Sequence, residues 1–516
     1  MSWQNEVDQL LRRRKLAEAM GGDSAVAKHE AEGRLTARKR IEVLLDSDSF
    51  REIGGLAGSA EYSEMGELIS FTPSNSIIGT GLINGRKVVI SADDFTIRGG
   101  SSDAAISEKW IYAERMALEL QIPLIRLVNS AGGSVKLLEA QKATKIPGYP
   151  SWELNRMLGV IPVVGVALGS CAGLGAIKVA SSHFSVMPRN TAQLFAAGPF
   201  VVKEGIGIEV DKNELGGSEV HARGSGVVDN EAEDEIDALK QACDFLSYLP
   251  QSVYCLPPAL VSADPLDRCD DWLLEAIPRD RKRVYDIRKI ISAVFDKNSF
   301  FEIGRYAGRS SVTGMARLMG QPVGVLANDP THAGGAMTLK SSQKIETFVD
   351  LCDTFHIPIV SLFDQPGVMI GPDAERLGTI RAANRALSAI EQSRVPWCTI
   401  ILRRAFGVAG AAHGRLGGIN LRYAWPSSSW GSIPLEGGIK AAFRREIDSS
   451  DKPAEIMSEL SAKYAGYTSP FRTAEQFGIS DIIDPRQTRP ILCDWIKSAV
   501  ELLPQLLGPS AKTMRR

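Results

Sequence analysis

The amino-acid sequence predicts an α/β protein built from two tandem domains that are copies of one unit. The first observation is an internal repeat, because residues 85–132 align with residues 320–367 at a constant offset of 235, with 13 of 48 positions identical. The second is that strand and helix alternate within each copy. At 516 residues the chain is long enough for two large domains. We therefore expect domains at 1–260 and 261–516, joined in the proline-rich segment 249–265.

Each copy opens with a strand, a helix and a second strand. The first strand is expected at 87–92 in the first copy and at 323–327 in the second, and each leads into a Gly-Gly loop. Over 107–121 a partly apolar stripe recurs at helical spacing. The segments IPLIRLV and IPIVSLF that follow are nearly continuous apolar runs, typical of parallel strands that are covered on both faces.

The rest of each copy adds a helix, a strand and a loop of small residues. Helices are expected at 152–158 and 379–392. In the first copy the strand 161–168 runs directly into GSCAGLGAIKVA, residues 169–180, and the second copy has AFGVAGAA at 405–412. This order requires crossover connections and predicts sheets that are largely parallel and layered with helices.

Composition and charge exclude several classes of function. With 59 basic and 61 acidic residues the formal charge is −2, which favours neither nucleic acid nor an anionic membrane as partner. The apolar runs are shorter than the ~20 residues of a membrane span, no signal-peptide pattern opens the chain, and a cytoplasmic location is expected. Seven cysteines without a CxxC pair and six histidines without HxxxH or HExxH spacing predict no metal site.

The small-residue loops at 169–180 and 405–412 are the strongest candidates for chemistry. Each could begin a helix whose first N–H groups have no partner and carry partial positive charge, which suits an oxyanion. Glycine and alanine would leave room for a carbonyl oxygen close to these amides. The alternative is that small residues serve tight helix–sheet packing, which is the commoner reason for such a turn.

A few polar residues are weaker candidates. Asp364 ends an apolar strand, with Asn129 in its place in the first copy, and is either catalytic or a cap for the next turn. Lys109 and Lys344 match between the copies and either contact phosphates or lie on a solvated helix face. The acidic block at 229–242 is expected to be an exposed helix start.

Longer motifs in combination resemble the carboxyltransferase (β) subunits of biotin-dependent acyl-CoA carboxylases, the propionyl-CoA carboxylase group. These motifs are LTARKRIEVLLD, DDFTIRGGS, GSCAGLGA, ELGGSEVHARGSGVVD, YDIRKII, and FDQPGVMIGPDAERLGTIR followed by RRAFGVAGAA. The resemblance covers the chain from residue 32 to about residue 500. It implies two crotonase-like domains, each a ββα superhelix, in subunits that pair the first domain of one with the second domain of another, commonly within a hexamer.

The implied activity is transfer of CO₂ from carboxybiotin to the α-carbon of an acyl-CoA. The chain has no biotin-accepting Lys in a Met-Lys-Met setting and no ATP-binding glycine loop, so the resemblance implies a partner with biotin carboxylase and biotin carboxyl carrier domains. Three alternatives stay open. The same transfer can run in reverse in an acyl-CoA decarboxylase, or the chain can be a biotin-independent decarboxylase of the crotonase type. It can also be a non-catalytic paralogue that serves as an assembly scaffold.

The resemblance also implies roles for individual residues. The amides of Gly173 and Leu174 would hold the thioester carbonyl of the acyl-CoA, and those of Val408 and Ala409 the ureido oxygen of biotin. Neighbouring positions implied in binding are, for the acyl-CoA, Gly132, Gly133, Gly198, Gly410 and Ala411, and, for biotin, Gly367 and Gly407.

Two stretches depart from the family pattern. The family's Asp-Ser-Gly-Gly-Ala-Arg is replaced by Asn-Ser-Ala-Gly-Gly-Ser at 129–134. The Tyr-Asp that follows the second loop in propionyl-type members is replaced by Gly410 and Ala411. Because two side chains are missing there, we expect an acyl group bulkier than acetyl or propionyl.

Overall fold

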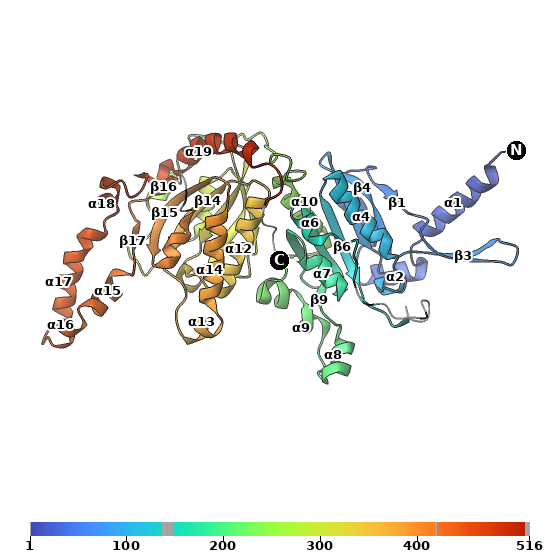
Figure 1. Ribbon diagram of the computed structural model, residues 1–516, viewed down its shortest axis with the longest axis horizontal. Helices are drawn as coiled ribbons and strands as arrows, with labels where there is room; N and C mark the ends of the chain where they lie inside the picture. The colour runs from blue at the N-terminus through green and yellow to red at the C-terminus, as the bar shows by residue number, and fades with distance from the viewer. Residues whose placement is uncertain are drawn as a thin grey trace. The chain divides into compact units, whose positions relative to one another are not determined.

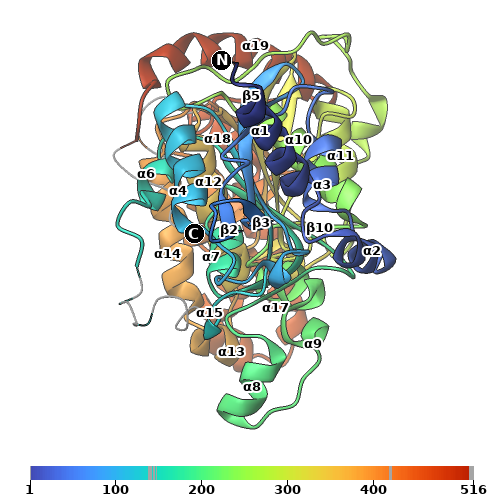
Figure 2. The same ribbon diagram turned by 90° about the vertical axis from the view of Figure 1, so that its right-hand side faces the viewer.

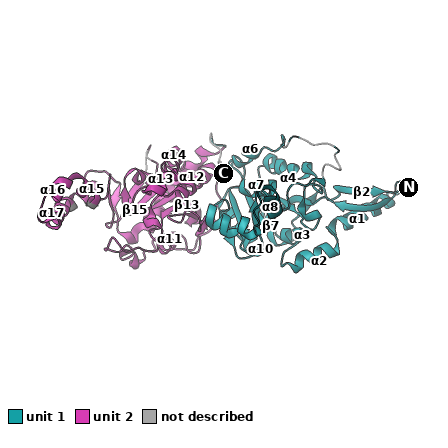
Figure 3. Ribbon diagram, turned by 90° about the horizontal axis from the view of Figure 1, so that it is seen from below, with its two compact units in different colours: residues 1–255, 509–516 teal, residues 256–508 magenta. Residues whose placement is uncertain are grey.

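The chain folds into two compact units, each built around one eight-stranded sheet (Figure 3). The computed structural model describes residues 2–136, 142, 146, 148–415, 417 and 421–510. Unit 1 contains Met1–Cys255 and the C-terminal end of the chain, and unit 2 contains Leu256–Gly508. The division falls within the proline-rich segment 249–265.

The sheet of unit 1 is mixed, with an antiparallel start and a parallel remainder. Its spatial order is β1 (Arg51–Ile53), β4 (Ser76–Ile83), β5 (Arg86–Asp93), β6 (Leu124–Ser130), β7 (Val163–Ala172), β8 (Phe184–Pro188) and β10 (Asn230–Ala232), and β9 (Gln193–Phe195) pairs with β7. β1, β4 and β5 are antiparallel neighbours, whereas all pairs from β5 onward are parallel. Parallel neighbours require crossovers, which the helices of the unit supply.

Helices cover both faces of this sheet. In Figure 2, α4 and α6 lie on one side of it and α3 and α10 on the other. The helices of unit 1 are α1 (Gln4–Glu18), α2 (Asp23–Ala31), α3 (Ala37–Leu44), α4 (Ser107–Leu120), α6 (Leu154–Leu158), α7 (Leu174–Ala180), α8 (Pro199–Ile206), α9 (Lys212–Gly216) and α10 (Glu235–Tyr248). A separate hairpin pairs β2 (Gly58–Tyr62) with β3 (Leu68–Pro73).

Unit 2 repeats this topology strand for strand, which confirms the duplication that the sequence predicts. Its order is β11 (Phe301–Ile303), β12 (Ser311–Leu318), β13 (Gln321–Asn328), β14 (Ile359–Gln365), β15 (Trp397–Phe406), β16 (Leu421–Ala424) and β18 (Asp481–Ile482), and β17 (Ser429–Gly431) pairs with β15. The strands of both sheets that are predicted from continuous apolar runs, β6 and β14, are buried along almost their whole length.

Two long helices of unit 2, α12 and α14, lie side by side against its sheet, and α15, α16 and α17 extend away from it (Figure 1). The helices of this unit are α11 (Ile287–Val294), α12 (Leu339–Thr354), α13 (Pro372–Arg376), α14 (Thr379–Gln392), α15 (Leu435–Ala442), α16 (Arg444–Asp448), α17 (Pro453–Ala465), α18 (Pro470–Glu475) and α19 (Thr488–Leu502). The helix predicted at 379–392 therefore has the expected bounds.

The strand predicted at 161–168 is longer than expected. β7 continues to Ala172 because its last residues pair with β9, Ser170 opposite Gln193 and Ala172 opposite Phe195. The same extension occurs in unit 2, where β15 pairs with β17. In both units the first residues of the small-residue loop are therefore paired with a short strand, β9 in unit 1 and β17 in unit 2.

The acidic block at 229–242 is not an exposed helix start throughout. Glu235, the first residue of α10, is 4% exposed and forms an ion pair with Arg40 of α3, which is 1% exposed. Arg40 also donates to the carbonyl oxygen of Leu168 in β7 at 2.7 Å. This buried pair fixes α3 and α10 against the sheet, and the expectation of a solvated block is wrong at this residue.

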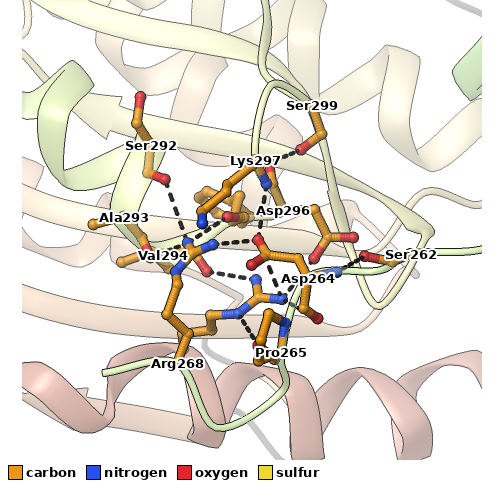
Figure 4. A network of polar contacts seen from close by, with 12 residues as sticks. Ser262, Asp264, Pro265, Arg268, Ser292, Ala293, Val294, Asp296, Lys297 and Ser299 are labelled. Atoms are coloured by element: carbon orange, nitrogen blue, oxygen red, sulfur yellow. Dashed lines mark hydrogen bonds and ion pairs between the residues drawn. The ribbon is translucent and has the colours of Figure 1, made fainter. Parts of the chain in front are cut away.

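The start of unit 2 is tied to the rest of the unit by a network of charges (Figure 4). Arg268 forms an ion pair with Asp264 and donates to the carbonyl oxygen of Phe295 at 2.9 Å. Asp264 accepts from the N–H of Lys297, and Asp296 accepts from Arg489 of α19 at 2.8 Å. The segment that follows the division between the units is therefore fixed within unit 2.

Candidate functional site

The loops that carry the predicted site residues meet at one edge of each sheet. The strands β5, β6 and β7 are parallel, so their carboxyl ends and the loops that follow lie at the same edge, and β13, β14 and β15 do the same in unit 2. This edge is where α/β sheets bind ligands. In unit 1 a Cβ added to Gly132 would lie 3.0 Å from the carbonyl oxygen of Ala172, which places the loop after β6 directly against the end of β7.

Gly173 forms the turn from β7 into α7. Its backbone has φ 57° and ψ −115°, a conformation that residues other than glycine rarely adopt. Its N–H donates to the carbonyl oxygen of Phe195 at 3.1 Å, and its own carbonyl oxygen accepts from Ile177 at 3.1 Å. The sheet bond ends at Gly173 and the helix bonds begin at Ile177, so the amides between them are left without a backbone partner in the described part of the chain.

Gly407 forms the same turn in unit 2. Its φ is 65° and ψ −161°, its N–H donates to the carbonyl oxygen of Gly431 at 3.0 Å, and its carbonyl oxygen accepts from the N–H of Gly410 at 3.0 Å. No hydrogen bond is found for the N–H groups of Val408 and Ala409 among the residues that the structure describes. Val408 is 73% exposed, so the start of this loop faces solvent.

One of the predicted amide donors, the N–H of Gly173, differs from the prediction. The N–H of Gly173 is bound to Phe195 and is not free, contrary to what the resemblance implies. Since Gly173 corresponds to Gly407, the pair equivalent to Val408 and Ala409 is Leu174 and Gly175. Sequence reasoning missed Gly175 because only the extension of β7 shows which amide the sheet uses.

The predicted glycines of the preceding loops are also equivalent. Gly132 has φ 85°, and its carbonyl oxygen accepts from the N–H of Ser102 at 3.0 Å. Gly367 has φ 140°, and its carbonyl oxygen accepts from the N–H of Met337 at 3.0 Å. Each bond therefore ties the loop after β6 or β14 to the loop after the neighbouring strand, β5 or β13.

The other predicted glycines are placed less tightly. At Gly133 an added Cβ would meet nothing within 4 Å. Gly198 lies beyond β9, immediately before α8, and an added Cβ there would lie 3.6 Å from the Phe195 ring. Neither glycine is constrained by packing as Gly132 is.

Gly410 does not widen a pocket by lacking a side chain. An added Cβ at Gly410 would lie 2.9 Å from the carbonyl carbon of Ala405, so backbone atoms fill this direction. Ala411 is half-buried. The expectation of a larger acyl pocket therefore loses one of its two residues, and only Ala411 still supports it.

The carboxyl edge of unit 2 carries a buried ion network around Asp364. Asp364 is 0% exposed and accepts from Arg403 Nε at 3.1 Å, Arg404 Nε at 2.6 Å and the hydroxyl of Tyr285 at 3.0 Å. Burial and the neighbouring Asp364 carboxylate raise the pKa of Tyr285 well above its ordinary value, which keeps the hydroxyl a donor. Asp364 thus holds two arginines rather than capping a turn.

Unit 1 has no such network at the equivalent positions. Asn129 replaces Asp364, and its side-chain oxygen and nitrogen are buried without a hydrogen bond in the described structure. Gly169 stands in the place of Arg403, and a Cβ there would lie 2.3 Å from Asn129 Oδ1. The amide at the strand end is therefore packed against a glycine. The residues RR before AFGVAG were the available sequence signal, and their pairing with Asp364 was missed.

In unit 1 the corresponding carboxylate lies at the end of the adjacent strand, β5. Asp93, at the end of β5, accepts from the N–H of Asn129 at 3.2 Å, as Asn328 in unit 2 accepts from the N–H of Asp364 at 3.1 Å. Burial raises the pKa of Asp93, and burial lowers the pKa of its cationic neighbour Lys178. The two units have thus exchanged acid and amide between adjacent strands.

The paired lysines are structural. Lys344 Nζ donates to the carbonyl oxygens of Gly304 at 3.0 Å and Ala307 at 2.9 Å. Lys109 is 8% exposed, and its chain packs against Gly54, the equivalent of Gly304. Both the solvated face and the phosphate contact that the sequence left open are wrong for Lys344, because its ammonium is used within the fold.

In the described part of the chain no group of three or more His, Cys, Asp or Glu residues could hold a metal ion. The helices within the described ranges also include none with the length and apolarity to cross a membrane.

Two turns of equivalent geometry, each presenting unpartnered amides at the edge of a duplicated sheet, define a protein that can stabilise negative charge on carbonyl oxygens. Residues 28–501 match the family described as carboxyl transferase domain, and the chain belongs to this family. The predicted resemblance is confirmed.

Relatives match along most of their length. The chain is 32% identical over 491 residues to the propionyl-CoA carboxylase carboxyltransferase subunit of Haloferax mediterranei, covering 95% of both chains. It is 32% identical over 491 residues to the methylmalonyl-CoA carboxyltransferase 12S subunit of Propionibacterium freudenreichii subsp. shermanii, covering 94% and 92%. It is 32% identical over 489 residues to the methylmalonyl-CoA decarboxylase subunit alpha of Veillonella parvula, covering 94% of both.

Solved structures agree. The transcarboxylase 12S structure with methylmalonyl-coenzyme A and methylmalonic acid bound, a hexamer assembly, has a TM-score of 0.87 and 29% identity, covering 97% of both chains. A single-chain, multi-domain long-chain acyl-CoA carboxylase has a TM-score of 0.81 and 26% identity, covering 96% of this chain and 50% of that one. The predicted α/β fold of two tandem crotonase-like domains is confirmed.

Proposed function

We propose that this chain is the carboxyltransferase subunit of an acyl-CoA carboxylase, and that it moves a carboxyl group between biotin on a partner protein and the α-carbon of an acyl-CoA. The observation that carries the proposal is the pair of equivalent turns at Gly173 and Gly407, which leave amides unpartnered at both sheet edges. Carboxybiotin supplies the activated carboxyl group. Acyl-CoA is the second substrate.

In unit 1 the amides of Leu174 and Gly175 bind the thioester carbonyl oxygen. When the α-carbon of the acyl-CoA loses its proton, negative charge gathers on this oxygen, and two fixed N–H dipoles stabilise it without reorganising. Each such donor typically contributes roughly 3–4 kcal/mol to transition-state stabilisation. Gly132, in the loop that packs against the end of β7, is proposed to line this position, and Gly133 and Gly198 are proposed with it from the family resemblance.

In unit 2 the amides of Val408 and Ala409 bind the ureido oxygen of biotin. The chemistry of this donor set fits the cofactor, because a ureido oxygen accepts two N–H groups as the thioester carbonyl does. Gly407 forms the turn that precedes these amides, and Gly367 lies in the loop after β14. The proposal needs no side-chain acid or base, because the two oxygens carry the developing charge.

The biotin carboxylase and biotin carboxyl carrier domains that load the cofactor belong to a partner subunit. We propose a hexamer of this chain, supported by the hexamer assembly of the 12S structure, and we keep the predicted cytoplasmic location. Residues 1–260 and 261–516 remain the proposed acyl-CoA and biotin domains.

A second candidate is the reverse transfer in a decarboxylase. It is favoured by the likeness to the methylmalonyl-CoA decarboxylase subunit, which equals the likeness to the carboxylase subunit in identity. The scaffold alternative is disfavoured, because both turns keep the conformation and the unpartnered amides that the chemistry needs.

The decisive assay needs only the purified chain and free substrates. With biocytin as acceptor and methylmalonyl-CoA as donor, we expect biocytin-dependent formation of propionyl-CoA, measured by chromatography. A panel of malonyl-CoA and longer or branched carboxyacyl-CoAs then ranks the acyl groups, and a bulkier group is expected to be preferred. Turnover with no dependence on biocytin would contradict the biotin-dependent reaction.

A further inference from the structure

The two sheet edges differ in charge although their turns are equivalent. At the edge of unit 2, Asp364 is paired with two arginines, so the ion network carries one net positive charge. At the edge of unit 1, the matching residues Asn129, Gly169 and Ser170 are all neutral. At the positions equivalent to this network, unit 2 therefore has two arginines and unit 1 has no charge, whereas the buried Lys178 of unit 1 lies beside the carboxylate of Asp93.

Arg404 is the exposed member of this network. Its Nε lies 2.6 Å from Asp364 Oδ1, and its Nη2 donates to the carbonyl oxygen of Gly334 at 2.7 Å. Its side chain is 23% exposed, against 6% for Arg403, and no hydrogen bond from its Nη1 is found among the described residues. The guanidinium is held on one side and open on the other.

The position of Arg404 relates it to the amide turn of unit 2. It lies in β15, three residues before Gly407, in the part of the strand that pairs with β17. It contacts Gly334, in the loop after β13, and Asp364, near the carboxyl end of β14. In unit 1 the equivalent Ser170 donates to Gln193 Oε1 at 3.0 Å instead, so its hydroxyl is used within the sheet.

We propose that Arg404 binds the carboxylate that is transferred, while this group is attached to the ureido nitrogen of biotin. This inference rests on the proposed function and adds a residue to it. In the transfer the bond from the carboxyl carbon to the ureido nitrogen breaks, its bond to the α-carbon forms, and the α-proton passes to the nitrogen. A carboxylate stands at the biotin side before the transfer, whereas the thioester carbonyl on the other side is neutral, which matches the charge of each edge.

A binding experiment tests the contact without turnover. The probes are biocytin and a stable analogue that carries a carboxymethyl group on the N1′ ureido nitrogen, so the added carboxylate is their only difference. By calorimetry we expect Arg404→Gln to weaken binding of the analogue roughly tenfold and to leave biocytin unchanged, because a charge-assisted hydrogen bond is lost. Arg404→Lys should stay within about threefold of the wild type. Equal loss for both probes, or no loss, would overturn the inference.

An activity experiment separates this inference from the proposed function. In the biocytin and methylmalonyl-CoA assay, Arg404→Gln should lower kcat roughly tenfold or more and leave both KM values within about twofold. The matched control is Arg385→Gln, which removes an exposed arginine paired with Glu346. Wild-type turnover with unaltered Arg404→Gln kinetics would reject the role of Arg404 alone. Absence of biocytin-dependent turnover in the wild type would reject the proposed function and this inference with it.

Discussion

Asp364 is the residue on which most of the charge at its sheet edge depends. It is fully buried and forms ion pairs with two guanidinium groups, one of which is itself 6% exposed. Removing one partner of a buried ion pair leaves the other as an uncompensated charge in a medium that solvates it poorly. The unit 1 counterpart avoids this cost by having no ionic group at either position.

Asp364→Asn should therefore lower the free energy of unfolding by about 3–5 kcal/mol. Adding Arg403→Met should recover part of this loss, since it removes the stranded buried charge. Urea unfolding at neutral pH measures both. Asp373→Asn, which breaks an exposed pair with Arg376, is the control and should change stability by less than about 1 kcal/mol. Additive losses in the double variant would contradict the account.

For single residues, the sequence predicted the loops of the proposed site but not which backbone N–H groups are free in them. Val408 and Ala409 stay proposed donors, whereas Gly173 is engaged by Phe195. Which amide is free depends on where a neighbouring short strand ends its pairing, and no local pattern reveals a bond between residues this far apart in the chain. The network of Asp364 likewise joins side chains from separate strands.

The turn from strand to helix is the element that positions the proposed site. In each unit a glycine with positive φ forms the last sheet bond and precedes the helix, and the two amides that follow it have no backbone partner among the described residues. A side chain at this glycine would shift the backbone of the amides that follow. The turn is therefore the place where a single methyl group should affect catalysis.

Gly173→Ala should reduce kcat for the carboxyacyl-CoA donor by about a hundredfold, because the displaced amides no longer stabilise the oxygen. The substitution also costs about 1–3 kcal/mol in backbone strain. Gly85→Ala is matched, with φ 74° in the turn between β4 and β5 and open space around its Cβ. It should lower stability similarly and leave kcat unchanged. Equal kinetics for the two variants would contradict the role of the turn.

Helix α12 is anchored by Lys344. Burial lowers the pKa of this lysine from 10.5 to about 7. Between pH 7 and 10.5 the unfolded chain binds the proton that the folded protein has released, so stability from this residue rises with pH across that window. Lys344→Met should flatten the rise in the free energy of unfolding between pH 7 and 10. The exposed Lys289→Met is the control, and a wild-type slope in Lys344→Met would contradict this expectation.

Most elements were predictable because their signals are local. Apolar runs and helical stripes predicted β6, β14, α4 and α14, whereas the extension of β7 beyond residue 168 needed a partner strand. The expectation of a solvated acidic block at 229–242 is wrong at Glu235 for the same reason, since its partner Arg40 belongs to α3, far away in the sequence.

For the whole molecule, the duplication was the most reliable inference from sequence. A constant offset with shared glycines is a property of the entire chain, and both sheets repeat it in strand order.

Assembly into a hexamer depends on the surface of the chain. α8 has no buried residue, and Phe200, Val201 and Ile206 are exposed on it.

Sedimentation at micromolar concentration should give a particle of about six times the 55.8 kDa chain mass if the proposed hexamer forms. Large exposed apolar side chains on one helix favour burial in an assembly. Phe200→Asp should shift the distribution to smaller species, and the exposed Lys289→Met should not. A monomer at all concentrations would contradict the proposed assembly.

The exchange of acid and amide between Asp93 and Asn129 in unit 1, and Asn328 and Asp364 in unit 2, couples the two strand ends of each unit. An aspartate at 129 would lie beside the buried carboxylate of Asp93, which already accepts from the N–H of residue 129 at 3.2 Å, and two carboxylates so close repel each other. Each half therefore has room for one acid at this pair of positions, and gaining one at either strand end is tied to losing the one at its neighbour.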